Sequence, residues 1–109
     1  MNKILKVGVL LGFIIFSSAG YAAKNTGVEI VSHLQYFSGH TGLLVRQPNM
    51  ISLEECTRDD LYQLDINHPH YKEMVSLILA AHISGQKLMF HLSGCNQGLP
   101  AILHVYSDK

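Results

Sequence analysis

The chain has 109 residues, of which 48% are hydrophobic and 15% charged, a length that fits one small domain. Lys and Arg together number 8, as do Asp and Glu, so the formal net charge is zero. This balance excludes a strongly basic nucleic-acid-binding protein and an acidic disordered segment. The two cysteines are too few for a disulfide-dense miniprotein or a four-cysteine zinc site.

The first 22 residues have the pattern of a Sec-type signal peptide. Lys3 and Lys6 precede an apolar run over residues 7–16, and small residues follow at 17–20. Gly20-Tyr21-Ala22 fits the small-x-small cleavage rule. The apolar run of about ten residues is much shorter than the roughly 20 needed to span a bilayer, which disfavours the alternative of a retained anchor. We therefore expect cleavage after Ala22 and export to the periplasm or the medium.

Removal of residues 1–22 leaves a mature chain of 87 residues, 23–109. It has six basic and eight acidic side chains, hence a formal charge of −2, and no nucleic-acid partner is indicated. No internal repeat or linker divides it, so the sequence predicts one domain without a membrane span.

Cys56 and Cys95 are the only cysteines of the chain. Because export takes them to an oxidising compartment, an even count predicts one disulfide between them. A redox-active or metal-binding pair is the alternative, but the C-x-x-C spacing that it needs is absent.

The first half of the mature chain has strand patterns. Residues 28–37 are rich in β-branched and aromatic side chains, with Val28, Ile30, Leu34 and Tyr36 on one predicted face. A glycine-containing turn over 38–42 and a second strand over 43–46 complete a predicted hairpin. A third, short strand is predicted near residues 50–56, before an acidic stretch that ends at Asp60.

The second half combines one helix with two strands. Apolar residues recur at helical spacing over about 68–84, with Asn67 or His68 as the predicted cap, Pro69 in the first turn and Gly85 as the C-terminal stop. Strands are predicted over 87–92 and 101–106, with a long turn over 93–98 between them. The chain is therefore expected to be α+β, mainly β, in the order β-β-β-α-β-β, which is the order of a five-stranded OB-like barrel.

This combination resembles small exported bacterial proteins related to the B subunits of pentameric toxins. The resemblance covers about the last 55 residues and rests on Cys56, Tyr62-Gln63-Leu64-Asp65, Leu77-Ile78-Leu79-Ala80-Ala81, Ser84-Gly85-Gln86-Lys87 and Gly94-Cys95. It implies an adhesive or receptor-binding role, commonly glycan recognition by a ring of identical subunits.

An aromatic and polar cluster around the predicted hairpin provides candidate ligand-binding residues, namely Tyr36, Phe37, His40 and Arg46. Aromatic rings stack on the C–H groups of a pyranose, while Arg and His bind hydroxyls. In the alternative interpretation Tyr36 and Phe37 only pack, one on each face of the strand.

Seven histidines suggest a metal site as a further hypothesis. His33, His91 and His104 lie on predicted strands that neighbour each other in an OB barrel, so their imidazoles could bind zinc or copper. Scattered exposed histidines are the alternative. His68 and His70 flank Pro69 at the helix start, where capping is the favoured role.

No nucleophile motif or phosphate-binding loop is present, and we expect a protein that is not an enzyme and needs no cofactor. The first functional hypothesis is an exported binding module for a glycan or a protein surface, in a homo-oligomer. The second is a periplasmic accessory or inhibitor protein that acts on an envelope partner. Metal binding through the histidines is the third.

Overall fold

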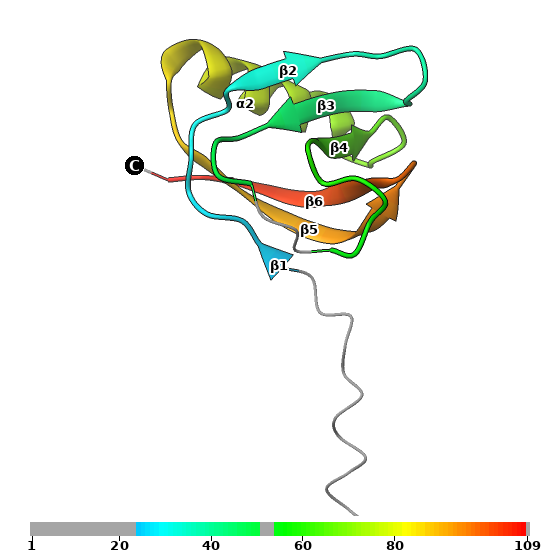
Figure 1. Ribbon diagram of the computed structural model, residues 1–109. Coiled ribbons are helices and arrows are strands. Elements are labelled where there is room, and N and C mark those ends of the chain that lie inside the picture. The colour runs from blue at the N-terminus through cyan, green and yellow to red at the C-terminus, as the bar shows by residue number, and fades with distance from the viewer. Residues whose placement is uncertain (1–23, 51–53, 109) are drawn as a thin grey trace, which may run out of the picture.

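The computed structural model describes residues 24–50 and 54–108, which form six strands and one helix (Figure 1). The predicted signal peptide lies outside these residues. The strands are β1 (Lys24–Asn25), β2 (His33–Gln35), β3 (Gly42–Arg46), β4 (Tyr62–Asp65), β5 (Leu88–Asn96) and β6 (Leu99–Ser107), and the helix is α2 (Tyr71–Ser84). They make one mixed sheet in the order β1-β5-β6-β4-β3-β2, in which only the β4–β6 pair is parallel among the pairs described.

The mainly β class with one helix is confirmed, whereas the five-stranded barrel is replaced by a six-stranded sheet that does not close. The two edge strands of this sheet, β1 and β2, both come from residues 24–35. Residues 24–29 follow β5, with mutual backbone hydrogen bonds between Glu29 and Leu88 of 2.8 and 3.1 Å. The chain then changes partner, and the Ser32 amide donates to the Arg46 carbonyl at 2.8 Å. The predicted continuous strand over 28–37 is therefore wrong, because this segment serves two different neighbours in succession.

The change of partner also alters which side chains are buried. Val28 and Ile30 were assigned to the apolar face with Leu34 and Tyr36, but they are 53% and 39% exposed. Val31 is buried instead. The period of two that strand residues follow is interrupted where the backbone leaves β5 and has not yet joined β3.

The side chain of Gln47 connects the end of β3 to the backbone at the start of β5. Its buried side-chain amide donates to the carbonyls of Glu29 and Leu88 at 3.1 and 3.0 Å. The residue after β3 is thus attached to the β5 edge, and a polar side chain takes over where strand pairing stops.

The third strand lies later than predicted. No strand is found at residue 50 or over 54–56, and residues 51–53 lie outside the described part. The strand is β4, where Tyr62, Gln63 and Leu64 are buried. It pairs with β3 on one side and with β6 on the other, so a central position buries a glutamine that the hydrophobic pattern gave no reason to place inside.

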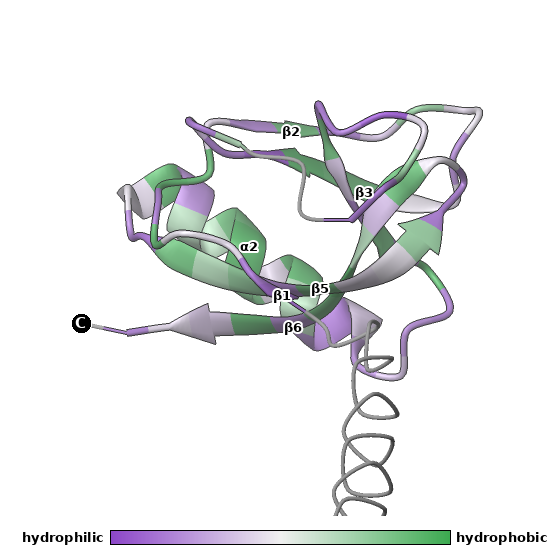
Figure 2. Ribbon diagram, turned by 60° about the horizontal axis from the view of Figure 1, so that its bottom comes forward, coloured by the Kyte–Doolittle hydropathy of each residue, from purple (hydrophilic) through white to green (hydrophobic). Residues whose placement is uncertain are grey.

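The predicted helix is confirmed, although it begins at Tyr71. Pro69 therefore precedes it, and His70 occupies the N-cap position without a side-chain capping bond. Gly85 ends the helix in the left-handed conformation with φ 79°, and its N–H donates to the Ala81 carbonyl. Met74, Ile78 and Ala81 are buried and belong to the main core together with residues of the sheet. Figure 2 shows hydrophobic stretches along α2, which lies against the sheet. No helix in residues 24–50 and 54–108 is long and apolar enough to cross a membrane.

The last two strands form a longer hairpin than predicted. Only Gln97 and Gly98 remain in the turn, and their φ values of 50° and 85° match a two-residue type I′ turn. The disulfide Cys56–Cys95 is confirmed, with a Cα–Cα distance of 5.7 Å. It fastens the loop before β4 to the end of β5, next to this turn.

Candidate functional site

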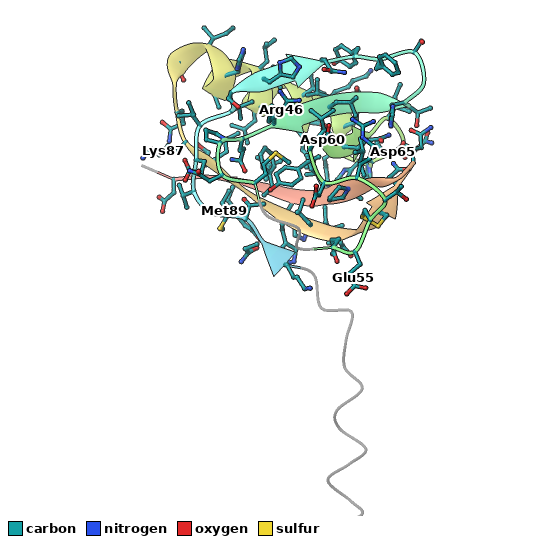
Figure 3. All side chains as sticks on the ribbon, viewed as in Figure 1. Arg46, Glu55, Asp60, Asp65, Lys87 and Met89 are labelled. Carbon is teal, nitrogen blue, oxygen red and sulfur yellow. A yellow bond between two sulfur atoms is a disulfide. The ribbon has the colours of Figure 1, made fainter. Side chains whose placement is uncertain are left out.

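The β2–β3 turn brings three of the four predicted ligand residues to one end of the sheet. The side chains of Tyr36 and Phe37 are 65% and 56% exposed, and the rings of Phe37 and His40 lie 6.1 Å apart between centroids. Arg46 is separated from them, because it ends β3 and pairs with His33 at the other end of the hairpin (Figure 3). Its Nε donates to the Asp60 carbonyl at 3.2 Å.

Tyr36 and Phe37 have different surroundings. Tyr36 lies near Tyr71 at the start of α2, and burial together with the neighbouring Tyr36 hydroxyl raises the pKa of Tyr71 to about 12. Tyr36 also lines an apolar groove of about 210 Å³ between β2 and α2, together with Val75 and Leu79. Phe37 instead lies against Gly39, where an added Cβ would come within 3.3 Å of the Phe37 ring. Both rings are exposed, but Tyr36 is placed against α2, whereas Phe37 lies on the turn next to His40.

A polar network beside Phe37 was not found from the sequence. The amide Oε1 of Gln97 accepts from the backbone N–H of Thr41 at 2.8 Å and from Nε2 of Gln63 at 2.7 Å. The Thr41 hydroxyl lies 3.1 Å from the same oxygen and 3.0 Å from Oδ1 of Asp65. The β5–β6 turn and the β2–β3 turn are thus connected across 56 residues of sequence. Both turns lie at the same end of the sheet (Figure 1).

These bonds fix the orientation of the Gln97 amide. The backbone N–H of Thr41 can only donate, so the atom that faces it must be the oxygen of Gln97. The amide nitrogen then points away from the network, and its bond to the Gly39 carbonyl is long, at 3.5 Å. Gln97 therefore offers N–H donors at an exposed turn.

Gln63 supports the network from below. Its side chain is fully buried, and its Nε2 also lies 3.3 Å from the Thr41 carbonyl. Its Oε1 has no hydrogen-bond partner, and among residues 24–50 and 54–108 the only other buried side-chain atom in this state is Nδ1 of His40. Two unpaired polar atoms near one surface site are unusual, because buried polar groups are nearly always paired.

The hairpin-tip site is defined here as Phe37, His40, Thr41, Asp65 and Gln97, with Gln63 beneath it. Nothing but the exposed aromatic residues and the glycines of the turn signalled it in the sequence. Thr41, Asp65 and Gln97 are common surface residues, and their convergence depends on strand pairings between distant segments.

The two arginines nearest to the site, Arg46 and Arg58, contact Asp60, which lies outside the site. Arg58 makes a bidentate contact with Asp60, with distances of 3.0 and 2.8 Å. This hydrogen bonding lowers the pKa of Asp60 and raises that of Arg58. Arg46 also donates to the Asp60 carbonyl, so both arginines are engaged with Asp60 and not with Asp65.

The histidines predicted to bind metal do not converge. His91 and His104 stack across β5 and β6 with ring centroids 5.3 Å apart, but His33 lies on β2 at the other edge of the sheet. The neighbour of His91 on the N-terminal segment is Asn25, to which it is hydrogen-bonded. In the described part of the chain no group of three or more His, Cys, Asp or Glu is placed to hold a metal ion.

His68 has a structural role as well. Its Nδ1 accepts from the backbone N–H of His70 at 3.0 Å, and its Nε2 lies 2.9 Å from the Leu103 carbonyl. Since both ring nitrogens are bonded to backbone groups, this imidazole holds the loop before α2 against β6.

Comparison with known proteins adds no relative: no family model matches the chain, and no curated protein matches its sequence.

Proposed function

We propose that this protein is an exported, non-catalytic binding module that recognises a carbohydrate through the hairpin-tip site. The observation that supports this most directly is the placement of an exposed aromatic ring, Phe37, near a network of hydrogen-bonding groups in which the Thr41 N–H fixes the orientation of the Gln97 amide. Sugars need both features, because their C–H faces stack on rings and their hydroxyls both donate and accept hydrogen bonds.

An OB-like fold is part of this proposal. Counted from β2, the strands lie side by side as first, second, third, fifth and fourth, and the helix lies between the third and the fourth, as in an OB barrel. In OB folds, the loop between the first two strands and the loop between the last two commonly bind oligosaccharides or oligonucleotides. The same two loops here are the turns that meet at Thr41 and Gln97, and the chain's net charge of zero disfavours a nucleic acid.

Export and the resemblance to toxin B subunits belong to the proposal as well. The disulfide Cys56–Cys95 is compatible with an oxidising compartment, and the signal-peptide pattern accounts for delivery there. The B-subunit resemblance adds the expectation of a homo-oligomer, in which several hairpin-tip sites would bind the same surface with increased avidity.

A glycan array is the direct test. We expect the wild-type protein to bind a limited set of glycans, and Phe37→Ala and Gln97→Ala each to lower affinity about tenfold, since each removes one contact worth about 1.4 kcal/mol. His33→Ala, at the far end of the same hairpin, is the matched control and should bind as the wild type does. Absence of binding to every glycan would reject the proposal.

A second candidate function, an accessory or inhibitory role on an envelope protein, is favoured by the apolar groove between β2 and α2. Leu79 is exposed in that groove, and Ile83 is exposed one turn further along the helix. A pull-down from the periplasm that recovers one envelope protein with the wild type, but not with Leu79→Glu, would support this role over the first.

A further inference from the structure

We propose that the hairpin-tip site selects uncharged sugars with adjacent hydroxyl groups and rejects sugars that carry a carboxylate. This inference rests on the proposed function, and it specifies the ligand class of the same site. It depends on the balance of donors, acceptors and charge that the site presents.

The acceptor side of the site is formed by Asp65. Its Oδ1 lies 3.0 Å from the Thr41 hydroxyl, and its Oδ2 lies 3.4 Å from the backbone N–H of Asn67. A carboxylate has about four lone-pair positions, so these two bonds leave capacity for ligand donors. The carbonyl of Gly39 adds a further acceptor, because its bond from Gln97 is only at the 3.5 Å limit.

The donor side is formed by Gln97. Its oxygen is saturated by Thr41 and Gln63, which leaves the amide nitrogen to face a ligand. Asp65 and Gln97 both contact the hydroxyl of Thr41, so the donor and the acceptor are on either side of one small residue. Adjacent hydroxyls of a pyranose match this arrangement, since one can donate to Asp65 while the other accepts from Gln97.

The charge at the site excludes an anionic ligand. The carboxylate of an acidic sugar bound here would lie beside that of Asp65, and like charges at such distances repel strongly where solvent is partly excluded. Arg58 and Arg46 cannot offset this repulsion, because both contact Asp60. The Nδ1 of His40 is buried without a hydrogen-bond partner, so this atom is not presented to a carboxylate at the surface.

Gln63 supports the donor side of the site from beneath. Its fully buried Oε1 is an acceptor without a donor, directly beneath Gln97. Because this oxygen is shielded from the surface, Gln63 acts on a ligand through its Nε2, which holds the Gln97 amide in place. The exposed part of the site thus presents acceptors on Asp65 and Gly39 and a donor on Gln97.

Pairs of immobilised oligosaccharides that differ only in a terminal sialic acid test this inference. The purified protein should bind the neutral member at least about tenfold more tightly than the sialylated one. Asp65→Asn removes the charge and keeps an acceptor oxygen, so the preference should fall below about threefold. Asp59→Asn, an exposed acid outside the site, makes the same change in net charge and should keep the wild-type preference.

The outcomes separate the two proposals. Equal or tighter binding of the sialylated member would overturn the selectivity inference and leave carbohydrate binding intact. An unchanged preference in Asp65→Asn would also overturn it, because the discrimination would then have another source. Binding to neither member, nor to any other glycan, would overturn both proposals together.

Discussion

At the scale of single residues, Gly42 is a position where the neighbouring backbone leaves no room for a side chain. Its φ is 141°, and a Cβ there would lie 2.0 Å from the carbonyl oxygen of Leu64 on β4. We expect Gly42→Ala to lower the free energy of unfolding by about 3 kcal/mol or more, measured by urea denaturation, because backbone must move to admit the methyl group. Gly94→Ala is the control: its φ is 73° but its Cβ would meet nothing within 4 Å, so about 1 kcal/mol should be lost. Equal losses would show that the β3–β4 contact is not the cause.

Substitution of Gln63 should affect thermal stability and ligand affinity differently. In Gln63→Met the orphaned Oε1 disappears, while Gln97 and the Thr41 carbonyl keep other partners at 2.8 and 3.0 Å. We expect the melting temperature to stay the same or rise, since a buried unpaired acceptor is costly. Affinity for the glycan identified on the array should fall about tenfold, because Gln97 loses its buried support. A parallel fall in stability and affinity would make Gln63 a purely structural residue.

Burial of Tyr62 should make the free energy of unfolding fall as pH rises in the alkaline range. Burial raises its pKa to about 12, above the ordinary value of 10 that it regains on unfolding. Below pH 10 both states are protonated; between pH 10 and 12 the unfolded state loses its proton first, so the stability contribution declines as pH rises. We expect Tyr62→Phe to lose about 1 kcal/mol less than the wild type between pH 9 and 11 in urea denaturation. Exposed Tyr106→Phe should follow the wild type, and a shared slope would argue against burial as the cause.

At the scale of elements, helix α2 has one side that stabilises the fold and one that does not. Ile78 is fully buried against the sheet, whereas Ile83 is 76% exposed. We expect Ile78→Ala to cost about 3 kcal/mol through lost burial and a cavity, and Ile83→Ala to cost less than about 0.5 kcal/mol. Thermal unfolding followed by circular dichroism measures both. A large effect at Ile83 would indicate that this side of α2 is covered in solution by another copy of the chain.

The elements that could be predicted from the sequence are those that depend on neighbours in the chain. Helix α2 follows from apolar spacing with Gly85 at its end, and the β2–β3 hairpin follows from its glycine-containing turn. The position of β4 could not be predicted, because Gln63 is buried by strands that come from both sides of it. The exposed aromatic residues of the candidate site were found for the same local reason. Thr41, Asp65 and Gln97 were missed because the β3–β4 and β4–β6 pairings between distant segments bring them together.

At the scale of the whole molecule, the disulfide connects the stability of the domain to the hairpin-tip site. Cys56 and Cys95 close a loop with a sequence separation of 39 residues, for which the chain-entropy model gives about 4 kcal/mol. The loop before β4, which contains Cys56, also holds the β5–β6 hairpin through two hydrogen bonds, from the Gly94 N–H to the Glu54 carboxylate at 3.0 Å and from the Arg58 N–H to the Gly98 carbonyl at 2.9 Å. Gln97 lies between these attachment points, so the loop also restrains a ligand-binding side chain.

Replacing both cysteines by serine should therefore have two effects. We expect the free energy of unfolding to fall by about 4 kcal/mol in urea denaturation, a large part of the roughly 5–10 kcal/mol typical of a domain this small. Affinity for the glycan should also fall, even at temperatures where the variant is still folded by circular dichroism, because the β5–β6 turn is no longer held against Thr41. Wild-type protein treated with dithiothreitol is the matched comparison and should reproduce both changes, while Phe37→Ala should lose affinity alone. Full affinity in the folded, reduced protein would mean that the strand pairings hold Gln97 in place without the disulfide.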